Sequence, residues 1–84
     1  MSEPSYDALI DARGLNCPWP LVKARQALMV LPAGARIRVL ATDPASRRDF
    51  EEFAEATGHG LEDAREDARE EVGTFLFLLV KRGA

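Results

Sequence analysis

The chain lacks the features that define several large classes of protein. It has a single cysteine in 84 residues, so no internal disulfide can form. Its single histidine has no partner at a metal-binding spacing, and no phosphate-binding glycine loop or Ser/His/Asp set occurs, so we predict no metal and no cofactor. No apolar run approaches the roughly 20 residues of a membrane helix. The start, MSEPSYDALID, lacks a secretion-signal pattern, which together with the lone cysteine predicts a cytoplasmic protein.

The overall composition is that of a small globular protein. Hydrophobic residues make up 46% and charged residues 30% of the chain, and its length suits one domain over 1–84. The net charge of −3 gives no general attraction to nucleic acid. The acidic stretches EEFAE and LEDAREDAREE are most simply solvated surfaces. We therefore expect protein partners, no membrane association, and contact with nucleic acid at most through a partner.

Hydrophobic periodicity and turn residues predict six elements in the order β-α-β-α-β-β. The first helix starts at Pro18 and ends at the turn of residues 31–34, and the second lies within residues 42–60. Residues 64–71 are ambiguous, because EDAR occurs twice and favours a helix but offers almost no apolar face. We interpret 60–66 as a polar strand and the rest of that stretch as a loop. Strands are predicted over residues 6–12, 35–41, 60–66 and 73–82.

The second helix carries end signals of its own. Asp43 is predicted to be its N-cap, with Pro44 at the first helical position, and Gly58 to stop it. Arg47 and Arg48 fall early in this helix, where the positive end of its dipole disfavours cations. This conflict indicates a use in docking a partner, although two exposed arginines with no role are the simpler interpretation.

The predicted elements favour an α+β fold. Two helices cannot cover both faces of a four-stranded sheet, so we predict a two-layer α/β sandwich with a mixed sheet and both helices on one face. The last strand is apolar on both sides, so it should lie centrally in the sheet or have its outer face covered. Arg36, Arg38 and Leu40 should then lie on the open face. We expect this face to be partly apolar and suited to a partner or to a weak dimer with a second copy.

The single cysteine, Cys17, lies between a predicted strand end and a predicted helix start. A helix N-terminus favours a thiolate, so we predict that the pKa of Cys17 is lowered. Pro18 and Pro20 suit a first helical turn, although they remove two N–H donors. Gly14 gives the turn its backbone freedom and Leu15 anchors the loop. Cys17 itself should be at least partly exposed.

Several of these residues have a second interpretation. A lone cysteine is commonly small, buried and inert, and only the polar loop around Cys17 makes a reactive thiol equally acceptable. Trp19 is either an exposed docking anchor or part of the core. We expect His59 to have a surface or helix-end role rather than a catalytic one. Asp11 is more simply a turn residue at the strand end than an influence on Cys17.

The segment DARGLNCPWP resembles the Cys-Pro-x-Pro signature of the TusA (SirA-like) sulfur-carrier family. In that family a strand ending in Asp is followed by Gly-Leu, one residue, and Cys-Pro-x-Pro at the head of the first helix. TDPASRRDF resembles the family's Asp-Pro-Ala start of the second helix, and TGHGL and the last strand ending in KRG also fit. The resemblance covers nearly the whole chain. The matching residues of the signature are Asp11, Gly14, Leu15, Cys17, Pro18 and Pro20.

This resemblance implies a sulfur carrier. Cys17 would accept sulfane sulfur as a persulfide from a cysteine desulfurase or a rhodanese-like donor. It would then relay the sulfur to an acceptor protein in tRNA 2-thiouridine synthesis, sulfur oxidation or molybdenum-cofactor assembly. The site would be shaped by Gly14, Leu15, Pro18 and Pro20. From their own chemistry, and not from the resemblance, Trp19, Arg47 and Arg48 are candidates for docking a partner.

The single thiol fits this role. No second cysteine can expel the bound sulfur and form a disulfide, so the sulfur must leave by attack from another molecule. A self-contained dithiol oxidoreductase would instead use Cys-x-x-Cys. We therefore expect a component of a sulfurtransferase system rather than a stand-alone enzyme. The alternatives are a redox-sensing module and a structural partner-binding module, both without sulfur transfer.

Overall fold

The secondary structure follows the predicted β-α-β-α-β-β order. The computed structural model describes residues 5–67 and 73–83, so the last part of the ambiguous 64–71 stretch lies outside the described residues. The polar strand predicted over 60–66 is confirmed, and the other elements are shorter than predicted. The strands are β1 (Ala8–Ala12), β2 (Arg36–Ala41), β3 (Gly60–Glu66) and β4 (Phe75–Val80), and the helices are α1 (Trp19–Val30) and α2 (Ser46–Thr57).

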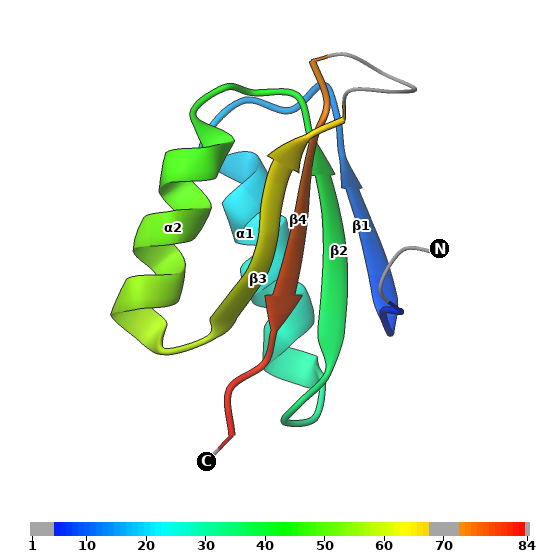
Figure 1. The fold of residues 1–84 in the computed structure, drawn as a ribbon, viewed down its shortest axis with the longest axis vertical. Coiled ribbons are helices and arrows are strands. Elements are labelled where there is room, and N and C mark those ends of the chain that lie inside the picture. Colours follow the sequence, from blue (N-terminus) through cyan, green and yellow to red (C-terminus); the bar gives the residue numbers. More distant parts are fainter. Residues whose placement is uncertain (1–4, 68–72, 84) are drawn as a thin grey trace.

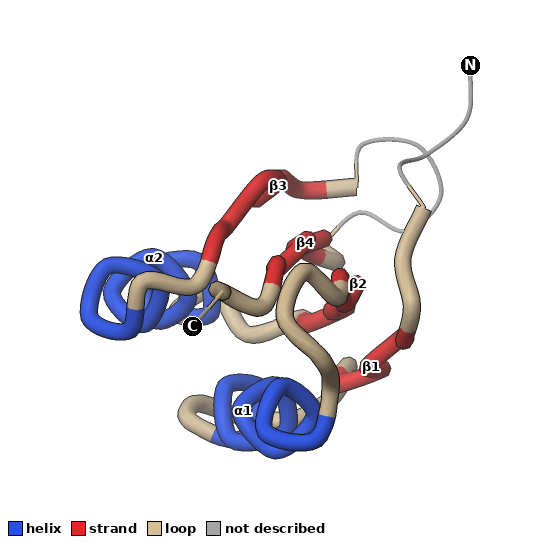
Figure 2. Tube along the Cα trace, turned by 90° about the horizontal axis from the view of Figure 1, so that it is seen from below, coloured by secondary structure: helices blue, strands red, loops and turns tan. Residues whose placement is uncertain are grey.

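The four strands form one mixed sheet in the order β1-β2-β4-β3. Strand β2 is parallel to β1, and β4 runs antiparallel to both of its neighbours. The apolar strand β4 is therefore central, as predicted. Figure 2 shows both helices on the same side of the sheet. The prediction of an α+β sandwich with a mixed sheet and both helices on one face is confirmed.

The core lies between the helices and the sheet. Ile37 and Val39 point from β2 toward the helices and are fully buried. Phe50 of α2 packs on Phe77 of β4 with ring centroids 4.6 Å apart, and both side chains are inaccessible to solvent. Burial of such large apolar side chains is the main force that holds a helix on a sheet. It thereby fixes the position of the first turn of α2.

The open face of the sheet carries both apolar and charged side chains. Arg36, Arg38 and Leu40 do lie there, opposite alternate residues of β4. Arg38, however, is only 4% exposed and pairs with Asp63 at 3.1 Å. A second ion pair joins Arg36 to Glu62 at 3.0 Å. Long charged side chains can cover apolar surface with their stems, so the ion-paired arginines lie over the apolar residues of this face.

The start of α2 also differs from the prediction. The helix begins at Ser46, and no side chain caps its first turn, so Asp43 is not the N-cap and Pro44 is not the first helical residue. Asp43 instead closes the preceding turn: its carboxylate accepts the Ala45 N–H at 3.0 Å, and its carbonyl accepts the Ser46 N–H at 2.9 Å. Its second carboxylate oxygen is thereby available to another segment.

The topology brings two loops together at one edge of the sheet. Strands β1 and β2 are parallel and adjacent, so they end at the same edge. Each is followed by a helix, and both helices begin at this edge, the upper end of Figure 1. The loop that carries Cys17 therefore lies beside the turn that leads into α2.

Candidate functional site

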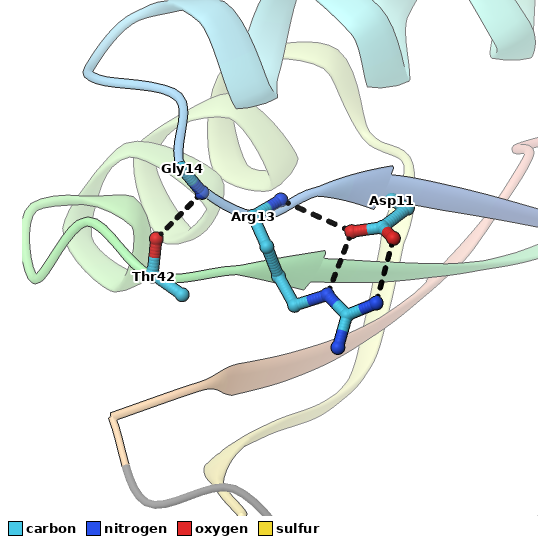
Figure 3. Close-up of polar contacts among 4 residues, drawn as sticks. All are labelled: Asp11, Arg13, Gly14 and Thr42. Carbon is cyan, nitrogen blue, oxygen red and sulfur yellow. Dashed lines mark hydrogen bonds and ion pairs between the residues drawn. The ribbon is translucent and has the colours of Figure 1, made fainter.

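The loop after β1 is tied to the end of β2. Its first turn is closed by the Leu15 N–H, which donates to the Ala12 carbonyl at 3.2 Å. Gly14 has a φ of +82°, a left-handed conformation that other residues rarely adopt. Its N–H donates to Thr42 Oγ1 at 2.9 Å (Figure 3). Gly14 thus shapes the loop as predicted, whereas Leu15 is only half-buried.

Asp11 and Arg13 form a hydrogen-bonded ion pair at the end of β1 (Figure 3). The Arg13 guanidinium donates to both carboxylate oxygens of Asp11, at 2.8 and 2.7 Å. The Arg13 N–H adds the expected turn bond at 3.2 Å. The hydrogen bonds from Arg13 lower the pKa of Asp11 to about 2. The charge of Arg13 is therefore directed at Asp11.

Cys17 is exposed and contacts two carboxylates from the α2 side. Its N–H donates to Asp43 Oδ2 at 2.5 Å, which anchors the backbone of the loop. Its thiol donates to Asp49 Oδ2 at 2.7 Å. Asp49 lies in the first turn of α2 and is half-buried. The backbone and the side chain of Cys17 are therefore both positioned by residues that lie more than twenty residues further along the chain.

The predicted lowering of the thiol pKa is wrong. The hydrogen bond to Asp49 raises the pKa of Cys17 above its ordinary value, and desolvation and the charges of Asp49 and Asp43 act in the same direction. A neighbouring carboxylate opposes a second negative charge on sulfur. In contrast, the N–H groups of Ala45 and Cys17 lower the pKa of Asp43, which stays ionised. Two carboxylates from the α2 side, with desolvation, therefore set the direction of the shift.

The start of α1 offers the thiol few donors. The peptide bond between Cys17 and Pro18 is cis, and Pro18 precedes the first helical residue. Pro20, in the first turn, is buried and has no N–H. The Trp19 N–H donates to the Asn16 carbonyl at 2.8 Å. The Trp19 side chain is 57% exposed, so it is not part of the core and lies on the surface close to Cys17 in the chain.

The other residues considered from the sequence lie on α2 and just beyond its end. Arg47 and Arg48 are exposed on α2, and Arg47 pairs with Glu51 at 3.5 Å. His59 lies at the far end of α2, where its Nδ1 accepts the Arg82 N–H at 3.0 Å and its ring packs near Phe53. Burial, followed by the charges of Lys81 and Arg82, lowers the pKa of His59. This is the helix-end role that the sequence predicted.

Sequence reasoning missed two residues of the site. Thr42 holds Gly14, and Asp49 holds the thiol. No local signal marks Asp49 as a partner of the thiol, because Cys17 lies 32 residues earlier in the chain. Within residues 5–67 and 73–83, no group of three or more His, Cys, Asp or Glu side chains is arranged to hold a metal. No helix in the described part of the chain is long and apolar enough to cross a membrane.

The structure is a two-layer α+β fold that presents one exposed thiol at the head of its first helix. This combination is typical of a small protein that acts through a single cysteine. The family model described as Sulfurtransferase TusA matches residues 8–81. The sulfur carrier protein TusA of Pseudomonas putida is 43% identical over 82 residues, which cover 98% of each chain. The protein of the same name from Allochromatium vinosum is 41% identical over 76 residues, 90% of this chain and 95% of that one.

A solved structure agrees with these sequence matches. The crystal structure of a SirA-like protein from Desulfitobacterium hafniense has a TM-score of 0.76 and 28% identity, and covers 92% of this chain and 100% of that one. The chain belongs to the TusA sulfurtransferase family. The resemblance seen in the sequence is thereby confirmed, and with it the sulfur-carrier class of the protein.

Proposed function

We propose that this sulfur carrier acts through Cys17, which receives sulfane sulfur as a persulfide and passes it to an acceptor protein. The observation that carries the proposal is the exposed Cys17 thiol on a loop whose backbone is anchored by Asp43. Because the chain has no second cysteine, a bound sulfur can leave only by attack from another molecule. A carrier must therefore have partner proteins that donate and accept sulfur.

The loading step is an exchange between a thiol and a persulfide. The Cys17 sulfur bonds to the terminal sulfur of the donor persulfide, and the S–S bond of the donor breaks. The electron pair of that bond stays on the donor sulfur, which takes up the proton released by the Cys17 thiol. The products are a Cys17 persulfide and a donor thiol, with no net oxidation. A cysteine desulfurase or a rhodanese-type protein is the class of donor that we propose.

The surroundings of the thiol support a docking role for the exposed groups nearby. Trp19 follows Cys17 by two residues and is largely exposed, and large aromatic side chains are frequent anchors in protein interfaces. Arg47 and Arg48 lie in the first turn of α2, the helix that supplies Asp49. We propose that a partner covers Trp19 and these arginines while it exchanges sulfur with Cys17. Gly14, Leu15, Pro18 and Pro20 shape the loop that makes this approach possible.

An intact-mass measurement tests the proposal. The protein is mixed with a cysteine desulfurase and cysteine, or with a rhodanese and thiosulfate, and its mass is taken without reductant. We expect a gain of one sulfur atom that a reductant removes and that Cys17→Ser abolishes. Trp19→Ala should slow loading by these proteins but not by a small persulfide. No gain from either donor would instead favour a redox-sensing or structural partner-binding module.

A further inference from the structure

The acidic partner of the thiol is held in place by the core of the protein. Asp49 lies in the first turn of α2, and its N–H donates to the Ala45 carbonyl at 3.1 Å. The next residue, Phe50, is fully buried against Phe77. A helix anchored in this way cannot turn about its axis without opening the core. The 2.7 Å contact between Asp49 Oδ2 and the Cys17 sulfur is thus built on a rigid element.

The charges around the sulfur are predominantly negative. From the α2 side it faces Asp49 and, through the loop backbone, Asp43. The nearest cation in the loop, Arg13, donates to both carboxylate oxygens of Asp11. Pro18 and Pro20, at the start of α1, have no N–H to offer a sulfur anion. Among the described residues, the hydrogen-bond partner of the sulfur is therefore an acceptor, which suits a protonated thiol and does not suit an anion.

We propose that Asp49 controls the charge on the Cys17 sulfur during the sulfur-transfer cycle, holding the empty thiol in its protonated form and repelling the loaded persulfide anion. The inference rests on the function proposed above for Cys17. A persulfide is a stronger acid than the corresponding thiol, so a loaded Cys17 carries negative charge at neutral pH. That anion cannot donate a hydrogen bond to Asp49, and two like charges at contact distance repel.

This arrangement gives a carrier two useful properties. The empty protein keeps little thiolate, the form that oxidants and electrophiles attack, so the site is protected between transfers. The loaded protein is raised in free energy relative to the empty one, so transfer to an acceptor becomes more favourable. Asp49 touches the reacting sulfur atom itself, and the proposal therefore makes it a catalytic residue of the transfer cycle.

Two measurements on Asp49→Asn test the proposal, with Glu52→Gln as the matched control. Glu52 is an exposed acid of the same helix, so both variants lose one negative charge. The first measurement is the rate of Cys17 alkylation by iodoacetamide against pH. The second is the equilibrium loaded fraction after exchange with glutathione persulfide and glutathione, read by intact mass. Asp49→Glu, which restores the carboxylate, provides a further test should Asp49→Asn fold poorly.

We expect Asp49→Asn to be alkylated several-fold faster at neutral pH, with its profile displaced to lower pH, and to retain several-fold more sulfur. Glu52→Gln should match the natural protein, and Asp49→Glu should return toward it. An unchanged alkylation profile overturns the protonation half of the proposal, and an unchanged loaded fraction overturns the repulsion half. If the natural protein takes up no sulfur, the function proposed for Cys17 fails and repulsion fails with it, while the alkylation profile still decides the role of Asp49 toward the thiol.

Discussion

The two ends of the helix pair use their polar side chains in opposite ways. Where α1 and α2 begin, Asp43 and Asp49 contact the Cys17 loop from outside it. Where the helices end, at the lower end of Figure 1, basic groups from the chain after β4 contact helix carbonyls. There Lys81 Nζ donates to the Leu28 carbonyl at 2.5 Å, and the Arg82 guanidinium donates to the Thr57 carbonyl at 2.8 Å.

The contacts at the helix ends stabilise the fold, whereas the contacts at the helix starts position the Cys17 loop and its thiol. Cations at helix C-termini satisfy free carbonyls and match the negative end of the dipole, so each contact at the lower end favours the folded state. At the upper end, the Asp43 carboxylate anchors a loop and the Asp49 carboxylate lies against an exposed thiol. The second of these contacts disfavours ionisation of the thiol and adds little to the core. The acidic end is therefore where contacts from another segment fix the position and the surroundings of Cys17.

The largest effect is expected from a residue of the core that holds α2 on the sheet. Phe50 is fully buried in the middle of the core, and truncation of a buried phenylalanine leaves a cavity. We expect Phe50→Ala to lower the free energy of unfolding by about 3–5 kcal/mol, measured by urea denaturation. Phe53→Ala, one turn along and only half-buried, serves as the control and should cost less. Equal losses in the two variants would contradict this account of the core.

The acidic end alone should respond to removal of Asp43. Asp43→Ala deprives the Cys17 N–H of its acceptor, and we expect persulfide formation to slow by about tenfold or more because the sulfur is misplaced. The initial rate is read by intact mass. Loss of the Asp43 charge would by itself lower the thiol pKa and speed the reaction. Slower loading would therefore indicate a misplaced sulfur, and faster loading would indicate the effect of the lost charge.

Asp7 offers a matched control for this prediction. It also accepts a backbone N–H from a distant segment, that of Arg36 at 2.8 Å, where β1 and β2 begin. We expect Asp7→Ala to leave the loading rate unchanged. A similar slowing in both variants would mean that the effect comes from a general loss of stability, and the distinction drawn between the two ends would not hold.

The smallest effect is expected at the basic end, from His59. Its pKa in the folded protein lies below the ordinary value of 6.5, so in the window below 6.5 the unfolded chain binds the proton and the folded protein does not. The stability that His59 contributes is therefore complete above this window and decreases as the pH falls through it. His59→Gln should show a shallower fall of Tm between about pH 7 and pH 5. Identical Tm profiles would contradict the prediction, and the sulfur-loading rate should not change.

Much of the architecture could be predicted because its signals are local. The apolar strand now seen as β4 has hydrophobic residues on both sides, which predicts a central position or a covered outer face, and the strand is central. The spacing of Ala24 and Leu28 predicts the buried side of α1, which the structure confirms. The exposure of Cys17 followed from its polar loop and the two prolines beyond it. Each of these inferences needed only a few neighbouring residues.

Two environments were missed because they depend on segments that are distant along the chain. Asp43 reads as a helix cap in its own neighbourhood, yet its carboxylate closes the turn before the helix and accepts the Cys17 N–H of a loop 26 residues earlier. Arg38 reads as an exposed charge on an alternating strand, yet Asp63 lies 25 residues later and pairs with it where both are partly buried. No local pattern contains the partner in either case, so the environment of these groups could not be inferred from pattern alone.

For this protein, local pattern was enough to establish the order of elements, the buried side of α1 and the position of the thiol before α1. The direction of the pKa shift of the Cys17 thiol was decided only in the folded molecule, where a carboxylate 32 residues further along the chain contacts the sulfur. The dipole of α1 acts on Cys17 through a helix start that has two prolines, whereas Asp49 acts through direct contact. Electrostatic influence depends on distance in space, and only the parallel pairing of β1 with β2 brings Cys17 and Asp49 together.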